Sequence, residues 1–173
     1  MGLDWHRMRP REGGTKPDLM DTPSVEFFTP RDFHQIKWLR NRYIGTDFRA
    51  DIYLDRSPEE AFALSEQLED VVEKYLSHRH DWLEEWMELR IDPGGPYYME
   101  VLEEYQLKHA EWDAEEDDEP CEEELFAMLL PEAEEARYDA LGPVDQDGVE
   151  YIREAAKFCL NCFENGHWLL TCY

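Results

Sequence analysis

The sequence predicts a mainly α fold with a small β component (α+β), with about five to seven helices and two or three short strands. Apolar residues recur at helical spacing over long stretches, and residues 57–60 (SPEE) have the pattern of a capping box that opens a helix. Short strands are expected at 24–28, at 50–54, where the residues alternate as in a strand, and at 167–173. Gly and Pro clusters separate these segments, which favours short, distinct elements in one compact fold.

The domain organisation expected from the sequence is one domain with an N-terminal appendage. Residues 1–23 are rich in Gly, Pro and charge, and predict an extended, mobile arm. Residues 24–173 predict a single acidic, mainly helical domain. The apolar fraction of 42% and the aromatic fraction of 13% favour a folded protein over a disordered acidic tail.

The first half of the chain predicts three helices. Thr29-Pro30 opens one with a Thr cap followed by Pro, and Gly45 ends it. The helix behind Ser57 has a clear apolar period at Ala61, Leu64, Leu68, Val71, Val72 and Tyr75. A polar turn over residues 78–81 is expected to separate it from a third helix, over 81–90, which carries Trp82, Trp86 and Met87 as core candidates.

The second half of the chain predicts four more helices. Residues 92–96 (DPGGP) break the chain, and a helix over 97–110 follows. Two short helices, over 123–130 and 131–141, are expected to meet at Pro131. The last helix covers about residues 148–164, stops at Asn165-Gly166 and leads into the C-terminal strand.

The net charge of −25 is the most unusual property of the chain. It arises from 42 Asp and Glu against 17 Lys and Arg, and the excess lies beyond the near-neutral first 50 residues. Contacts with phosphate need Lys and Arg, so this charge disfavours direct binding to nucleic acid or to an anionic membrane. The natural counterpart is a basic protein surface, of the kind that proteins handling DNA or RNA carry.

The densest acidic run covers residues 111–124 (EWDAEEDDEPCEEE), with ten acids and no base. Such a run is typical of a solvated loop. Trp112 and Cys121 interrupt it, however, and Leu125 follows it at once, which favours a protein-binding edge. With help from the acids of the predicted 81–90 helix, the candidate partner-binding residues are Glu84, Glu85, Glu88, Glu111, Trp112, Asp113, Glu115, Glu116, Asp117, Asp118, Glu119, Glu122, Glu123 and Glu124.

Four residues near the C-terminus have the spacing of metal ligands. Cys159, Cys162, His167 and Cys172 stand as C-x2-C-x4-H-x4-C. This spacing resembles the zinc knuckle of retroviral type, and the resemblance implies a structural zinc ion held by these four side chains. Leu160 stands where that family usually has an aromatic residue, and no basic residue follows Cys159. The alternative, which we favour, is that the cysteines pack as core residues of a helix and a strand, with no cofactor.

The sequence favours a protein that binds a macromolecule over an enzyme. It contains no G-x-G-x-x-G, P-loop, G-x-S-x-G or H-E-x-x-H motif. The leading hypothesis is an acidic binding or inhibitor protein that docks on a basic, nucleic-acid-handling protein. In its strong form it is a DNA mimic, comparable in charge and size with anti-restriction, anti-CRISPR and immunity proteins. The alternatives are a zinc-stabilised adaptor with a C-terminal CCHC site, and an enzyme whose site is unrecognised.

The expected location is the cytoplasm, including that of a virus-infected cell. No apolar run has the length of a signal peptide or a membrane span. The four cysteines do not have the arrangement of a secreted disulfide framework.

Overall fold

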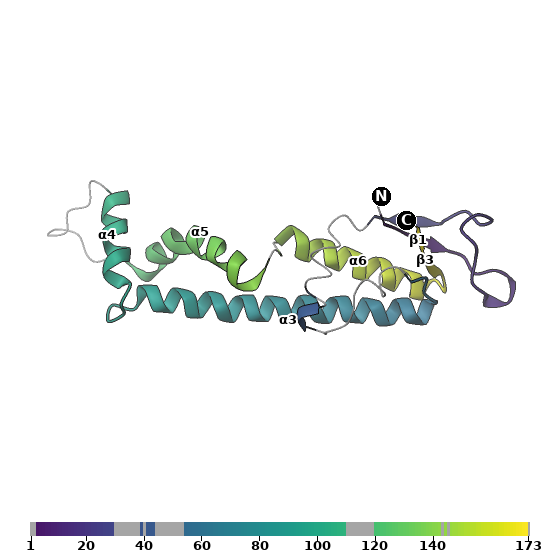
Figure 1. Ribbon diagram of the computed structural model, residues 1–173, viewed down its shortest axis with the longest axis horizontal. Coiled ribbons are helices and arrows are strands. Elements are labelled where there is room, and N and C mark those ends of the chain that lie inside the picture. Colours follow the sequence, from purple (N-terminus) through teal and green to yellow (C-terminus); the bar gives the residue numbers. More distant parts are fainter. Residues whose placement is uncertain are drawn as a thin grey trace. The chain divides into compact units, whose positions relative to one another are not determined.

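The computed structural model describes residues 3–29, 39, 41–43, 54–109, 120–142, 144 and 146–172. Its elements are, in order, β1 (Asp4–Met8), η1 (Glu12–Gly14), β2 (Glu26–Phe28), α3 (Pro58–Ile91), α4 (Tyr98–Lys108), α5 (Glu122–Leu141), α6 (Gln146–Glu164) and β3 (Trp168–Cys172) (Figure 1). The strands form one three-stranded antiparallel sheet. The predicted mainly helical α+β class is therefore confirmed.

By packing, the chain divides into two compact units. Unit 1 consists of Met1–Leu76 and Val144–Tyr173, and unit 2 consists of Ser77–Pro143. α3 contributes its first part to unit 1 and its last part to unit 2. No Gly- or Pro-rich linker marks the boundary inside α3. The single domain expected over residues 24–173 stays a prediction.

The sheet of unit 1 places the N-terminal strand at its centre. The strand order is β2-β1-β3, and Trp5 of β1 lies opposite Phe28 of β2 and Thr171 of β3. Trp5 and Met8 are fully buried. Residues 4–8, which the sequence analysis assigned to an extended arm, thus form the central strand. The partner strand β3 lies at the other end of the chain, so local sequence patterns do not reveal this pairing.

Helix α6 packs on this sheet, and the first part of α3 adds further buried residues to unit 1. The capping box predicted at Ser57 is present: Glu60 N donates to Ser57 Oγ at 3.2 Å, and Ser57 N donates to a Glu60 carboxylate oxygen at 2.8 Å. The ring of Phe28 lies 5.3 Å from that of Tyr151 and 5.7 Å from that of Phe158, so β2 packs on α6. The helix expected from Thr29-Pro30 to Gly45 and the strand expected at 50–54 lie mostly outside the described residues.

α3 is a single helix of 34 residues, where the sequence analysis expected two helices and a polar turn at 78–81. No Gly or Pro lies between Glu59 and Ile91, so nothing in this stretch breaks the backbone hydrogen bonds. Polar residues between two helical patterns therefore did not indicate a turn. Among the described residues, none of the helices combines the length and the apolarity needed to cross a membrane.

α5 is likewise one helix of 20 residues, where two short helices were expected to meet at Pro131. Pro131 lacks the N–H that would bond to the carbonyl four residues earlier. The helix continues because Leu129 on one side of it and Ala133 on the other are buried in the same core. The last helix, its stop and the final strand are confirmed: α6 ends at Glu164, Gly166 has φ of 63°, and β3 follows.

Candidate protein-docking surface

Unit 2 has its own hydrophobic core, which holds three helical segments together. The last turns of α3 supply Met87, and α4 and α5 pack around it. Trp86 is partly buried against this core, which agrees with the core role expected from its spacing. The fully formed core consists of Met87, Tyr98, Val101, Tyr105, Leu125, Leu129 and Ala133.

A tight turn over residues 92–96 joins α3 to α4 and forms one wall of a hollow in unit 2. Gly94 N donates to Asp92 Oδ1 at 3.1 Å, and Gly95 N donates to the Asp92 carbonyl at 2.8 Å. A Cβ on Gly95 would lie 3.1 Å from the Asp92 carbonyl oxygen and 3.2 Å from that of Leu89. Both are backbone atoms, so the turn favours glycine at residue 95.

The opposite wall is the first turn of α5, where three consecutive glutamates stand. Cys121 caps this helix: Glu124 N and the Cys121 side chain interact, and Cys121 N donates back to a Glu124 carboxylate oxygen at 3.3 Å. Glu122, Glu123 and Glu124 all lie at the positive end of the helix dipole. That position stabilises each carboxylate by about 0.3–1 kcal/mol, so the fold tolerates this concentration of charge without basic partners.

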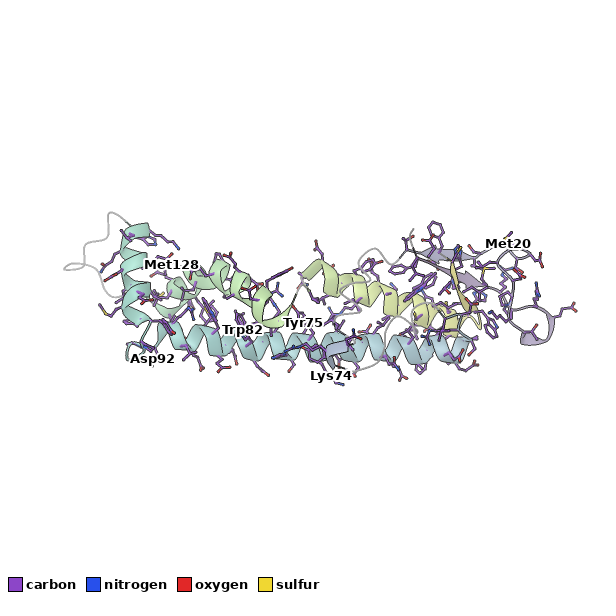
Figure 2. All side chains as sticks on the ribbon, in the orientation of Figure 1. Met20, Lys74, Tyr75, Trp82, Asp92 and Met128 are labelled. Atoms are coloured by element: carbon purple, nitrogen blue, oxygen red, sulfur yellow. The ribbon has the colours of Figure 1, made fainter. Side chains whose placement is uncertain are left out.

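Between these walls lies a hollow of about 710 Å³, formed entirely by residues of unit 2. Asp92, labelled in Figure 2, contributes to it where α3 ends. The lining combines apolar side chains with four carboxylates and contains no Lys, Arg or His. Its residues are Glu85, Glu88, Leu89, Ile91, Asp92, Pro93, Gly95, Pro96, Tyr98, Pro120, Glu122 and Leu125.

The basic residues of unit 2 are all engaged elsewhere. Residues 77–143 contain 22 of the 42 acids but only four of the 17 Lys and Arg. Lys108 pairs with Glu104 at 2.6 Å, and the guanidinium of Arg90 lies 3.6 Å from the ring centroid of Trp86. The carboxylates of the hollow form no ion pair with any residue that the structure describes. They are therefore available to a cation from outside.

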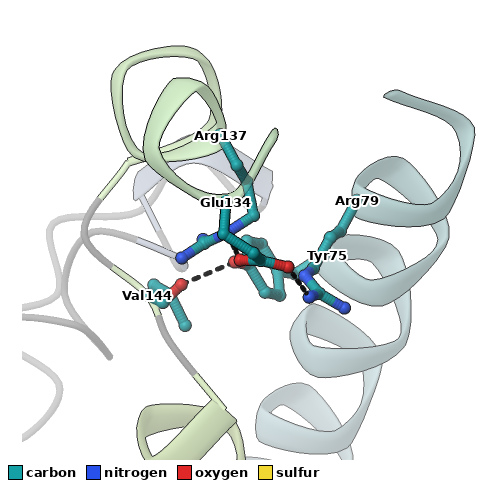
Figure 3. A network of polar contacts seen from close by, with 5 residues as sticks. All are labelled: Tyr75, Arg79, Glu134, Arg137 and Val144. Carbon is teal, nitrogen blue, oxygen red and sulfur yellow. Dashed lines mark hydrogen bonds and ion pairs between the residues drawn. The ribbon is translucent and has the colours of Figure 1, made fainter. Parts of the chain in front are cut away.

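The other two arginines of unit 2 converge on one carboxylate, Glu134 (Figure 3). Arg137 Nε donates to Glu134 at 2.7 Å, and Arg79 pairs with the other oxygen of the same group. Burial alone would raise the pKa of Glu134, but the hydrogen bonds and charges of Arg137 and Arg79 hold its pKa below the usual value. This network links α3 to α5 within unit 2 and leaves neither arginine to neutralise the hollow.

A second hollow, of about 500 Å³, lies along one stripe of α5. Residues three and four apart share one face of a helix, and this stripe runs from the first turn through Phe126 to Leu130. Glu122 lines both hollows. The second one is formed by Glu122, Glu123, Phe126, Ala127 and Leu130.

The structure brings together part of the predicted partner-binding set. Glu85, Glu88 and Glu122 line the first hollow, and Glu123 lines the second. Glu84 instead lies 3.3 Å from His80, and Glu124 belongs to the α5 cap. The remaining members lie outside the described residues, namely Glu111, Trp112, Asp113, Glu115, Glu116, Asp117, Asp118 and Glu119. The binding role of the whole set stays a prediction.

Sequence reasoning missed the apolar half of this surface. Residues 92–96 were interpreted only as a break, although two prolines beside acidic helices also indicate a rigid wall. Phe126 and Leu130 are four residues apart on α5; Phe126 is partly buried beside the core of Leu125 and Leu129, and Leu130 is exposed. That second apolar stripe was visible in the sequence and is the signal that would have identified the surface.

The four residues with zinc-knuckle spacing lie on α6, on β3 and in the turn between them. Cys159 and Cys162 are buried on α6, while Cys172 is exposed on β3. His167 directly precedes β3 and Cys172 is its last residue. At a rise of about 3.3 Å per residue their backbones are about 16 Å apart along the strand, too far for both side chains to bind one zinc ion at about 2–2.3 Å. Across the described residues, which include all four, no three His, Cys, Asp or Glu side chains gather into a group able to hold a metal ion.

Burial keeps the thiols of Cys159 and Cys162 protonated and weakly reactive. Burial raises the pKa of the Cys162 thiol to about 12. Burial, and then the neighbouring Cys162, raise the pKa of Cys159 well above its usual value. Both thiols stay protonated near neutral pH, whereas the thiolate is the form that binds metals and attacks electrophiles.

Comparison with known proteins adds no relative to this description. No protein-family model, no curated protein sequence and no solved structure matches the chain.

Proposed function

We propose that this chain is an acidic, non-enzymatic binding protein that docks on the basic surface of a nucleic-acid-handling partner. The observation that carries the proposal is the first hollow of unit 2, with Glu85, Glu88, Asp92 and Glu122 around an apolar lining and no base among its residues. Carboxylates that form no ion pair with a described residue attract a cationic surface and speed its association.

The charge of the chain as a whole supports a partner of this class. A net charge of −25 repels nucleic acid and anionic lipid and attracts positive surfaces. The range of this attraction becomes shorter as the salt concentration rises. Proteins that contact phosphate backbones carry such positive surfaces. Docking there would occlude the groove that binds nucleic acid, as anti-restriction, anti-CRISPR and immunity proteins do. We place this action in the cytoplasm, where the free thiols of the chain stay reduced.

Affinity capture followed by direct binding tests this function. The chain serves as bait, each captured protein is then purified, and its affinity is measured by interferometry over a series of salt concentrations. We expect a basic partner, a steep loss of affinity as salt rises, and competition with duplex DNA or RNA for the partner. We also expect no shift of labelled DNA by the chain alone.

Two outcomes would contradict the function. One is a set of specific partners that are neutral or acidic. The other is an affinity for a basic partner that stays constant from low to high salt, because attraction between exposed charges is screened by salt.

A further inference from the structure

The first hollow of unit 2 is lined mainly by apolar residues, and this limits which partner segment fits it. Seven of the twelve residues around the first hollow are Leu, Ile, Pro or Tyr. A row of carboxylates that only imitated phosphates would need no apolar floor. A floor of this kind favours an occupant that inserts apolar side chains, because removing apolar surface from water stabilises the complex.

The carboxylates around the floor favour arginine over lysine in the occupant. Glu85, Glu88 and Asp92 line the same hollow as Tyr98 and three prolines. A guanidinium is planar, weakly hydrated and able to bind a carboxylate with two parallel hydrogen bonds. The ammonium of lysine is strongly hydrated and loses more hydration free energy than a guanidinium when it enters such a hollow. Within unit 2, the guanidinium of Arg90 already lies over the rings of Trp86 and Tyr97.

Glu122 connects the two hollows into one surface. It lines both, and the second continues along α5 through Phe126 to Leu130, which is 42% exposed. Leu89, 50% exposed, lies on the first. A single extended or helical segment that crosses the first turn of α5 therefore reaches an apolar floor on each side and a carboxylate at the crossing.

We propose that these two hollows bind one segment of the partner in which arginines alternate with bulky apolar residues. The inference rests on the proposed function and adds the chemistry of the docking segment. A second copy of this chain is a poor occupant, because unit 2 holds 22 acids and four bases and would repel itself.

Four synthetic peptides of equal length test the chemistry of the segment. They are an Arg-Leu repeat, an Arg-Gly repeat with the same charge, a Lys-Leu repeat with the same apolar content, and a Glu-Leu repeat. Binding to the whole chain is measured by fluorescence anisotropy at low and at high salt. We expect the Arg-Leu repeat to bind about tenfold more tightly than the Arg-Gly repeat, to exceed the Lys-Leu repeat, and to keep part of its affinity at high salt.

Matched variants locate the binding. Leu89→Ala/Leu130→Ala removes apolar side chains from both hollows, and Leu107→Ala on α4, 80% exposed, is its control. We expect about tenfold weaker binding of the Arg-Leu repeat by the first variant and no change by the control.

A second pair of variants tests the charges. Glu88→Gln/Glu122→Gln neutralises one carboxylate on α3 and the shared one on α5, whereas Glu103→Gln/Glu135→Gln removes two exposed carboxylates that line neither hollow. We expect roughly tenfold weaker binding from the first pair and less than twofold from the second.

The outcomes separate this inference from the function on which it rests. Equal binding of the Arg-Leu and Arg-Gly repeats, weakened equally by both glutamate pairs, would overturn the inference and leave a general acidic docking protein. Tight binding of spermidine that Leu89→Ala and Glu88→Gln abolish would assign the first hollow to a small cation and also overturn the inference. Failure of every basic peptide to bind at low salt, or equal binding of the Glu-Leu repeat, would overturn the proposed function itself.

Discussion

Arg137 Nε donates a hydrogen bond of 2.7 Å to the carboxylate of Glu134. Both residues lie on α5, three positions apart, and Arg137 is only 7% exposed. Arg79 reaches the other oxygen of that carboxylate from α3. Breaking a pair that includes a buried guanidinium leaves an uncompensated charge, which costs more than an exposed ion pair contributes.

Glu134→Gln is expected to lower the free energy of unfolding by about 1–2 kcal/mol at neutral pH, allowing for the partial exposure of Glu134. Because its pKa is lowered in the folded state, the carboxylate stabilises the fold above its unfolded pKa of about 4.3, and this contribution is lost as pH falls through the folded pKa. The difference in the free energy of unfolding between variant and wild type should therefore become smaller in acid. Urea unfolding over a pH series measures this difference. Glu135→Gln is the control, and equal stability of the two variants at neutral pH would contradict the role of Glu134.

Leu129→Ala is expected to destabilise the chain by about 2–5 kcal/mol, because Leu129 is fully enclosed in the core of unit 2 and its truncation leaves a cavity. Leu130→Ala, at the next residue, is expected to cost less than about 1 kcal/mol, since that side chain is half exposed. Denaturant midpoints compare the two. Similar losses in both variants would show that α5 is rotated from the orientation described.

Gly95→Ala is expected to cost about 1–3 kcal/mol, because the new methyl group meets two backbone carbonyls. Gly94→Ala places its methyl group 3.7 Å from the Asp92 carboxylate and is expected to change stability by less than about 0.5 kcal/mol. Thermal unfolding of both variants measures the difference. If both were neutral, the turn that forms one wall of the hollow would be looser than described.

Ser57→Ala is expected to destabilise α3 by about 1 kcal/mol through loss of the capping hydrogen bond to Glu60 N. Ser77→Ala is the matched control: Ser77 is exposed inside α3, where alanine is the better helix former, so a neutral or slightly stabilising effect is expected. Circular dichroism during thermal unfolding compares the two. A loss from Ser77→Ala as large as that from Ser57→Ala would argue against the cap.

Iodoacetamide near neutral pH is expected to modify the exposed Cys121 and Cys172 and to spare Cys159 and Cys162, whose thiols are buried and protonated. Peptide mass mapping with and without denaturant identifies the modified residues. The zinc-knuckle hypothesis makes a different prediction, namely that a chelator exposes Cys159 and Cys162. Unchanged protection in the presence of chelator would support packing in the core.

Local signals in the sequence predicted the elements whose ends depend on neighbouring residues. The cap at Ser57, the stop at Gly166 and the strand after it are all short-range patterns, and each is present. Where the interpretation failed, long-range packing overrode a local signal. Pro131 does not end α5, because residues on both sides of it enter the same core.

The sequence by itself determined the acidity of the chain, its helical class and the concentration of carboxylates near residues 84–88 and 122–124, because charge and periodicity are properties of neighbouring residues. Only the tertiary structure decided that Trp5 enters the central strand and that Glu88 and Glu122 face one hollow. Those relationships join segments far apart along the chain. They are set by which apolar surfaces bury one another, and no local pattern records that choice.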